Sequence, residues 1–241
     1  MSPLSRAELR IGVCPDRLVV AHRGSHEIVK AGDDRMPALK EIAARGAPVT
    51  LVVSNHYARY CLLSSNALSS DRDWIAYARH VLTATYGGDS ASWVVRLTRT
   101  ETSDCRVACA LDAGLVDELS ALPGLQSLQP YLMAAFNPRR RALRSATAWI
   151  VFQEPGRMLI GFLDRGTWRV LRVRQATDDW QRTLPDLLDR EAAIAGTASC
   201  DRLFVCAEEE VPPEIGRYQT TDISLVRGAG GELRPYLMTL H

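Results

Sequence analysis

The sequence has little lysine, no long apolar run and no excess of positive or negative charge. Only Lys30 and Lys40 are present, so nearly all positive charge is arginine, as expected of a genome rich in G and C. The formal net charge of +1 gives no electrostatic reason to expect a nucleic-acid partner. No run reaches the length of a membrane span, and residues 1–10 lack an apolar signal-peptide core. We therefore expect a soluble, cytoplasmic protein.

The sequence also lacks the motifs of metal and disulfide sites. It has six cysteines but no Cys-x-x-Cys pair, and no histidine stands at metal-ligand spacing from a cysteine. Most of the cysteines lie within apolar runs such as residues 105–110. This placement is typical of buried free thiols in a reducing compartment. We expect no metal site and no disulfide framework.

Motifs for catalysis are missing as well. There is no Gly-x-Ser-x-Gly elbow, and no cysteine stands in a recognisable activated setting. The histidines at positions 22, 26, 56 and 80 are dispersed, which favours surface side chains. Asp112 follows a strand-like run, where a carboxylate can hold Mg²⁺ or act in catalysis, but a helix N-cap is the favoured alternative. The sequence predicts no catalytic residue and no turnover.

What the sequence does contain is a compact series of strands in residues 148–175. Three β-rich runs are joined by tight turns at residues 154–156 and 164–166, each ending in glycine. The first two runs are apolar on both faces, which predicts central strands, and the arginine-rich third run predicts an edge. A helix is expected over residues 178–195, with Leu187, Leu188 and Ile194 facing the core. Because Pro185 lacks a backbone N–H, the helix is expected to kink or to restart near Leu184.

A similar order opens the chain. Residues 9–14 and 18–23 predict two strands around a turn, and a helix (37–45) and two strands (49–54 and 58–63) follow. The clearest helix covers residues 71–86, with Ser70 as its N-cap and Gly87 just beyond its end. A strand pair (91–98 and 105–111) and a helix from Asp112 to Leu122 come next. Later strands are expected at 202–206 and 223–226.

The repeated order predicts a two-lobed α/β protein, with lobes at residues 1–140 and 141–241. The lobe boundary is placed between Asn137 and Ala146, where arginines at positions 139, 140, 141 and 144 make the strongest break in composition. Trp149, Trp168 and Trp180 are expected to be core and lobe-closing residues.

A set of apolar and aromatic positions extends over most of the chain. It comprises residues 59–63 (Arg-Tyr-Cys-Leu-Leu), Trp74, 78–80 (Ala-Arg-His), Tyr86-Gly87 and Trp93, and then 108–112, 125–130 and the strands of 149–174. In these positions, above all in residues 53–97, the chain resembles the cytoplasmic domain of type II secretion protein L and the related type IV pilus protein PilM. The resemblance implies an actin-like, ribonuclease H-like duplicated fold. It also implies a non-catalytic cytoplasmic scaffold, peripheral at the inner membrane, in a pilus or secretion assembly platform.

The chain departs from the pattern of PilM-like members, which bind ATP between the lobes. A phosphate site needs consecutive backbone N–H groups, usually from Gly, Ser or Thr. The turns at residues 15–17 and 154–157 supply no such run. We therefore expect no cofactor, with a PilM-like ATP-binding protein as the alternative and an unrelated enzyme as a less favoured one. The chain also departs from secretion protein L in ending without a membrane span.

The resemblance implies a partner: an inner-membrane assembly protein whose short N-terminal cytoplasmic tail docks between the lobes. The assembly ATPase is a second partner that it suggests. An extended tail can add to a sheet edge, and the candidate edge residues are Arg59, Tyr60, Thr167 and Arg169. The cluster Arg139, Arg140, Arg141 and Arg144 is a candidate lipid contact, with a solvated hinge as the alternative.

Overall fold

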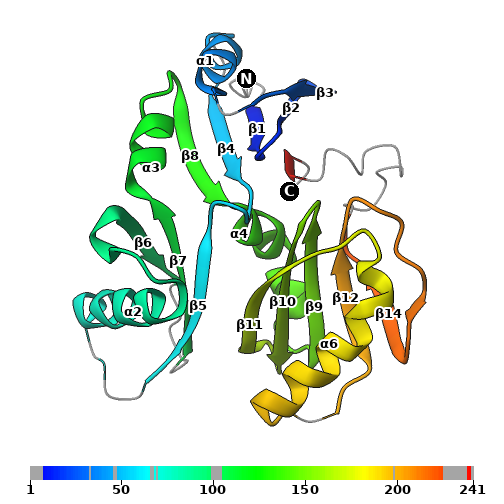
Figure 1. Ribbon diagram of the computed structural model, residues 1–241. Coiled ribbons are helices and arrows are strands. Elements are labelled where there is room, and N and C mark those ends of the chain that lie inside the picture. The colour runs from blue at the N-terminus through cyan, green and yellow to red at the C-terminus, as the bar shows by residue number, and fades with distance from the viewer. Residues whose placement is uncertain are drawn as a thin grey trace, which may run out of the picture.

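The computed structural model describes residues 8–32, 34–45, 48–65, 68, 70–98, 105–197, 199–224 and 238–239, and its strands form three sheets (Figure 1). The first sheet has the order β3-β2-β1-β4-β8. Its strands are β1 (Leu9–Val13), β2 (Arg17–His22), β3 (Ser25–Lys30), β4 (Val49–Val53) and β8 (Leu125–Pro130). β1, β2 and β3 form an antiparallel meander, and β4 and β8 extend it in parallel. Helix α1 (Met36–Ala43) connects β3 to β4.

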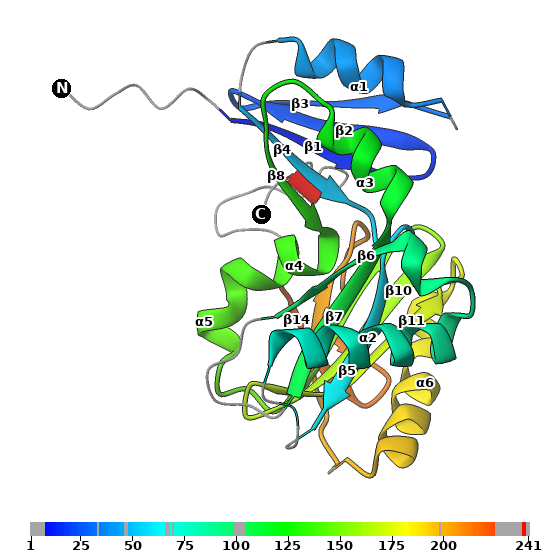
Figure 2. The same ribbon diagram turned by 90° about the vertical axis from the view of Figure 1, so that its left-hand side faces the viewer.

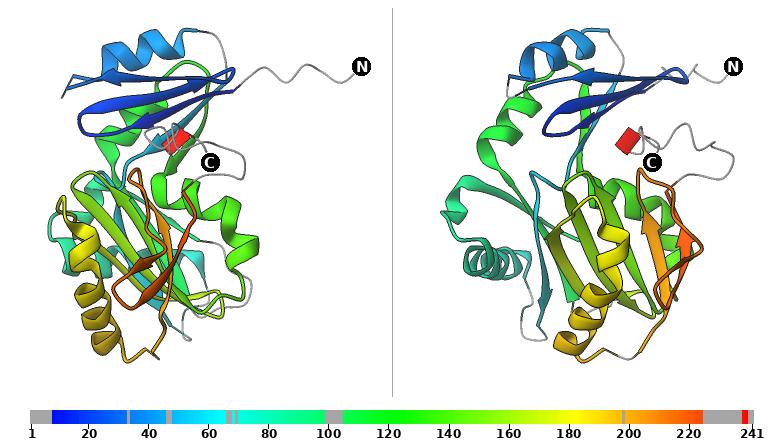
Figure 3. Two further views of the ribbon diagram at one scale, coloured as in Figure 1. Left: turned by 90° about the vertical axis from the view of Figure 1, so that its right-hand side faces the viewer. Right: turned by 45° about the vertical axis from the view of Figure 1, so that its right-hand side comes forward.

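The second sheet has the order β11-β10-β9-β12-β14-β13. Its strands are β9 (Ala148–Glu154), β10 (Arg157–Asp164), β11 (Thr167–Gln175), β12 (Arg202–Cys206), β13 (Glu214–Ile215) and β14 (Tyr218–Asp222). Trp149 and Val151 pack with helix α6 (Trp180–Ala195) on one face, whereas Ile150 and Phe152 join the core shared with the first sheet. Both faces are therefore covered, as expected of an apolar central strand, and α6 lies on the outer one (Figure 3).

A third, small sheet is inserted between β4 and β8. It has the order β5-β7-β6, formed by β5 (Arg59–Ser64), β6 (Trp93–Leu97) and β7 (Cys105–Asp112). Helix α2 (Asp71–Tyr86) packs on it through Trp74, Ala78 and Leu82. The backbone N–H of Asp73 donates to the Ser70 side chain, which confirms the expected N-cap. The short helix η1 (Ser90–Ser92) leads into β6, and α3 (Ala113–Ser120) leads from β7 to β8.

Three short helices connect the first sheet to the second: α4 (Tyr131–Phe136), η2 (Asn137–Arg139) and α5 (Arg140–Leu143). The lobe boundary expected between Asn137 and Ala146 stays a prediction; the residues in that range form η2, α5 and part of the segment before β9. Among the described residues, no strand pairing joins β1–β8 to β9–β14. One apolar core nevertheless includes residues from both sheets, such as Ile11 and Phe152.

Two expectations about the second lobe are wrong. Ile194 does not face the core, because its exposed fraction is 62%. Leu188 is buried as expected, together with Trp180, Leu184 and Glu191, and Leu187 is partly buried against the same core. The last described strand is β14 and not residues 223–226, because Ile223 and Ser224 already lie beyond it; residues 225 and 226 lie outside the described part. The sequence of β14 is mostly polar, whereas residues 223–226 are mostly apolar, and the strand was therefore predicted at the apolar residues.

Candidate functional site

Four segments from the two lobes meet at one place, which we call the junction. They are the turn after β1, the loop after β4, the turn between β9 and β10, and the residues after β12. Arg17 of the first lobe donates through Nη2 to Oε1 of Glu208 at 2.5 Å. Nε2 of His56 lies 2.9 Å from the carbonyl oxygen of Pro155. Side chains of the protein itself thus contact both turns at which phosphate binding was considered.

A buried carboxyl group, that of Glu154, links the lobes at the junction. Its Oε1 accepts a hydrogen bond from Ser54 Oγ at 2.5 Å, and its Oε2 accepts one from the Asn55 backbone N–H at 3.0 Å. The residue is only 4% exposed. Burial raises the pKa of Glu154 to about 7, although both hydrogen bonds favour the charged form. This end of β9 is therefore engaged with the first lobe and is closed to solvent.

The same loop fixes Tyr60, one of the candidate partner-binding residues. Its hydroxyl donates to Asn55 Oδ1 at 2.6 Å, and the Leu132 backbone N–H donates to the same oxygen at 3.2 Å. Tyr60 is 3% exposed, and burial raises its pKa well above the usual range. Its side chain is therefore a core element that no docked strand can reach. Arg59 is half-buried, with its guanidinium carbon 4.8 Å from the centre of the Trp93 ring.

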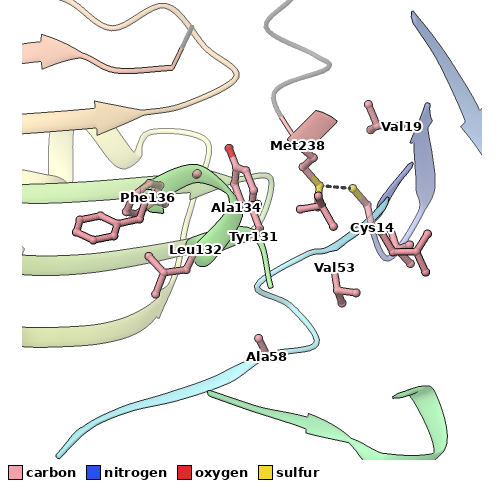
Figure 4. Close-up of a cluster of buried hydrophobic side chains, with 14 of the residues drawn as sticks. Cys14, Val19, Val53, Ala58, Tyr131, Leu132, Ala134, Phe136 and Met238 are labelled. Carbon is pink, nitrogen blue, oxygen red and sulfur yellow. Dashed lines mark hydrogen bonds between the residues drawn. The ribbon is translucent and has the colours of Figure 1, made fainter. Parts of the chain in front are cut away.

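The last described residues pack on β1 beside the junction (Figure 4). Cys14 Sγ donates to Met238 Sδ at 3.2 Å, and Arg10 Nη1 donates to the carbonyl oxygen of Thr239 at 3.4 Å. Met238 also lies so close to Gly12 that a Cβ there would be 2.9 Å from the Met238 Cβ. Met238 and Thr239 thus lie against β1 next to the first of the two turns.

A separate pocket of about 880 Å³ lies between the small sheet, β8 with α4 and α5, and the turn from β10 to β11. Figure 2 shows these elements. Its apolar lining includes Leu97, Val107, Leu128, Met133, Phe136 and Trp168. It also carries four exposed arginines, Arg96, Arg140, Arg144 and Arg165. Among the described residues, no carboxylate lines it. We call it the arginine pocket.

The β10–β11 turn places Arg165 and Thr167 at the arginine pocket. Arg165 and Gly166 have φ angles of 49° and 77°, the positive values at both central positions that a type I′ hairpin turn requires. The Gly166 N–H donates to the carbonyl oxygen of Ala146 at 2.8 Å, and a Cβ on Gly166 would collide with the Arg144 carbonyl. Only glycine therefore lets this turn lie against the segment after α5.

The structure brings three of the candidate site residues together. Arg140, Arg144 and Thr167 all line the arginine pocket, whereas Arg141 is exposed outside its lining. Arg139 is half-buried and donates to the carbonyl oxygens of Ala135 at 2.7 Å and Ser224 at 3.0 Å. It thus ties the end of α4 to the second lobe, a structural role that leaves its guanidinium less available to lipid.

The two candidate edges lie against each other, because β5 and β11 are neighbours (Figure 1). Arg169 on β11 is exposed, and its guanidinium lies 3.5 Å from the Asp164 carboxylate.

Sequence reasoning missed Arg96, Arg165 and Trp168 at the pocket. Arg165 could have been found, because it stands two residues before Thr167 in a predicted turn. Arg96 carried no such local signal.

Asp112, the candidate catalytic or Mg²⁺-binding carboxylate, has a structural role. Asp112 Oδ1 accepts from the Leu115 N–H at 3.3 Å, which confirms the favoured N-cap. Within the described ranges, no group of three or more histidine, cysteine or acidic residues could hold a metal ion. None of the helices in those ranges is long and apolar enough to cross a membrane.

The order of strands, with two meander-based sheets facing each other across a junction, defines the actin-like class of fold. The sequence itself matches no protein-family model and no curated protein. Among solved structures, the chain is similar to a Bacteroides thetaiotaomicron protein described as having an actin-like ATPase fold and unknown function. The TM-score is 0.60 at 9% identity, over 84% of this chain and 82% of that one.

Two further similar structures come from secretion and pilus systems. One is the cytoplasmic domain of EpsL, an inner-membrane component of the type II secretion system of Vibrio cholerae. It gives a TM-score of 0.56 at 12% identity, over 96% of this chain and 92% of that one. The other is a chain of the PilM-PilN type IV pilus biogenesis complex, with a TM-score of 0.54 at 12% identity, over 85% and 82%. The expected fold and the structural resemblance are confirmed.

Proposed function

We propose that this chain is a non-catalytic scaffold of a type IV pilus or type II secretion assembly platform. It works in the cytoplasm, peripheral at the inner membrane, and binds the short N-terminal cytoplasmic tail of a membrane partner. The assembly ATPase is a further proposed partner. The observation that carries the proposal is the likeness of fold, over most of both chains, to the cytoplasmic domain of EpsL and to a chain of the PilM-PilN complex.

The arginine pocket is the proposed place for the tail. The junction is a poorer place, because Arg17, Glu154 and Met238 already make contacts there. The pocket combines apolar lining with two outer strands, since β6 and β8 each stand at the end of the strand order of their sheet. An extended peptide can add to such an edge through backbone hydrogen bonds, while apolar side chains enter the pocket.

A PilM-like ATP-binding protein is the second candidate, because the fold is also similar to that of a protein described as having an actin-like ATPase fold and unknown function. The turns after β1 and β9 argue against it: they hold one glycine, Gly156, and engage other protein groups. Thermal unfolding with and without Mg-ATP separates the two candidates. A ligand present at 100 times its dissociation constant adds about 2.7 kcal/mol to the free energy of unfolding. We expect no shift, and a saturable shift of that size favours the ATP-binding candidate.

The scaffold proposal is tested in the native cell. The chain is expressed with and without the membrane proteins encoded beside it, and the membrane and soluble fractions are compared. We expect the chain in the membrane fraction only when those proteins are present. If it stays in the soluble fraction in both cases and co-purifies with no inner-membrane assembly protein, the scaffold proposal is wrong.

A further inference from the structure

The charges of the arginine pocket point to the chemistry of its ligand. Arg96, Arg140, Arg144 and Arg165 surround one pocket, and within the described residues the only ion pair among the four is a 3.6 Å contact between Arg165 and its chain neighbour Asp164. Four guanidinium groups around one partly enclosed pocket repel one another and create a positive potential there. A bound anion relieves that repulsion, and a guanidinium can hold a carboxylate by two parallel hydrogen bonds.

We propose that the arginine pocket selects an acidic peptide segment in extended conformation. This proposal rests on the docking site proposed above and adds the chemistry of its occupant. The outer strands β6 and β8 favour a peptide over a small anion, because each offers an edge to which a strand can add.

The arrangement of the lining also predicts a sequence pattern for the peptide. Side chains of an extended segment alternate between two faces. Apolar residues on one face suit Leu97, Leu128 and Phe136, and acidic residues on the other suit the exposed arginines. The selected segment therefore carries Asp or Glu at alternate positions, with apolar residues between them.

The test is a display library of short random peptides, selected in parallel on the wild-type chain and on two variants. Arg140→Glu/Arg144→Glu reverses two charges of the pocket, and Arg141→Glu reverses an exposed neighbour outside its lining. We expect Asp and Glu at alternate positions in peptides selected by the wild type and by Arg141→Glu. We expect that pattern to vanish for the double variant, with the affinity for the wild-type peptides falling roughly tenfold or more.

Circular dichroism shows whether the double variant is folded, and Arg140→Lys/Arg144→Lys provides a second test that keeps the charge. The lysine variant should retain the acidic preference with weaker binding, because lysine lacks the planar fork. Selected peptides without acidic enrichment, the same enrichment with the glutamate variant, or a library that yields no arginine-dependent peptide would each overturn the inference. If the double variant instead loses only its binding to vesicles containing phosphatidylserine, the arginines contact lipid and the peptide inference is wrong.

This result is separable from the scaffold proposal. A wild-type chain that selects acidic peptides but does not associate with its membrane neighbours retains the pocket inference and loses the scaffold proposal. A chain that associates with those proteins but shows no preference for acidic peptides retains the scaffold proposal and loses the pocket inference.

Discussion

At the scale of single residues, the environment of Glu154 is the most informative. The carboxyl group is buried where the lobes meet, and its hydrogen-bond donors are Ser54 and Asn55 rather than a cation. A buried carboxylate without a paired charge is unfavourable, so the group holds its proton to a higher pH than usual. The contribution of Glu154 to the free energy of unfolding is therefore lost as the pH rises, and not as it falls.

Glu154→Gln should reduce the pH dependence of stability. The folded pKa is about 7 against an ordinary value of 4.5, so the folded state retains a proton that the unfolded chain has lost. The free energy of unfolding of the wild type therefore falls as the pH rises through this window, by about 3 kcal/mol from this group. Urea unfolding at about pH 5 and about pH 7.5 measures most of this effect, a difference of about 2 kcal/mol.

The comparison with Glu154→Gln isolates this group from Glu208, whose pKa burial also raises. At the lower pH, Glu154→Gln and the wild type should have similar free energies of unfolding. At the higher pH, the free energy of unfolding of Glu154→Gln should be the larger of the two. Equal loss of stability in both proteins over this range would show that Glu154 is not the group responsible.

Two glycines in hairpin turns provide a matched pair. Gly24 and Gly166 have φ angles of 81° and 77°, but a Cβ on Gly24 meets no atom within 4 Å, whereas one on Gly166 meets the Arg144 carbonyl. Gly24→Ala should cost about 1 kcal/mol from backbone strain alone, and Gly166→Ala about 3 kcal/mol or more. Urea midpoints check this; equal costs would mean that the Arg144 segment moves aside freely.

At the scale of elements, most of the fold could be predicted where the signals are local. Helix α2 begins and ends as expected, because Ser70 and Gly87 mark its ends within the sequence itself. The strands β9 and β10 were found because both of their faces are apolar. β14 was missed because its pairing with β12, and not its polar sequence, makes it a strand.

Substitutions in α6 test the corrected orientation of that helix. Leu188 is fully buried and Ile194 is 62% exposed, although the sequence placed both on the core side. Leu188→Ala should lower the free energy of unfolding by about 2–5 kcal/mol, as a cavity-forming change. Ile194→Ala should change it by less than about 0.5 kcal/mol. A large cost at Ile194 would mean that the end of α6 is covered by something else.

At the scale of the whole molecule, the site could be predicted only in part. The arginines at positions 140 and 144 were marked by their cluster, and Thr167 by its strand edge. Their convergence with Arg96 could not be predicted, because it depends on how the small sheet is placed against α4 and α5. The partner was expected between the lobes, where Glu154 and Met238 make contacts with Ser54 and Cys14. These contacts join residues far apart in the chain, so the sequence could not predict them.

The central claim is that this chain binds the cytoplasmic tail of a membrane partner in the arginine pocket. Calorimetric titration of the purified chain with synthetic N-terminal tails of the neighbouring membrane proteins tests it most directly. We expect one tail to bind the wild type and Arg141→Glu alike, and to bind Arg140→Glu/Arg144→Glu roughly tenfold more weakly or not at all. If no tail binds, or if the double variant binds as tightly as the wild type, the claim is contradicted.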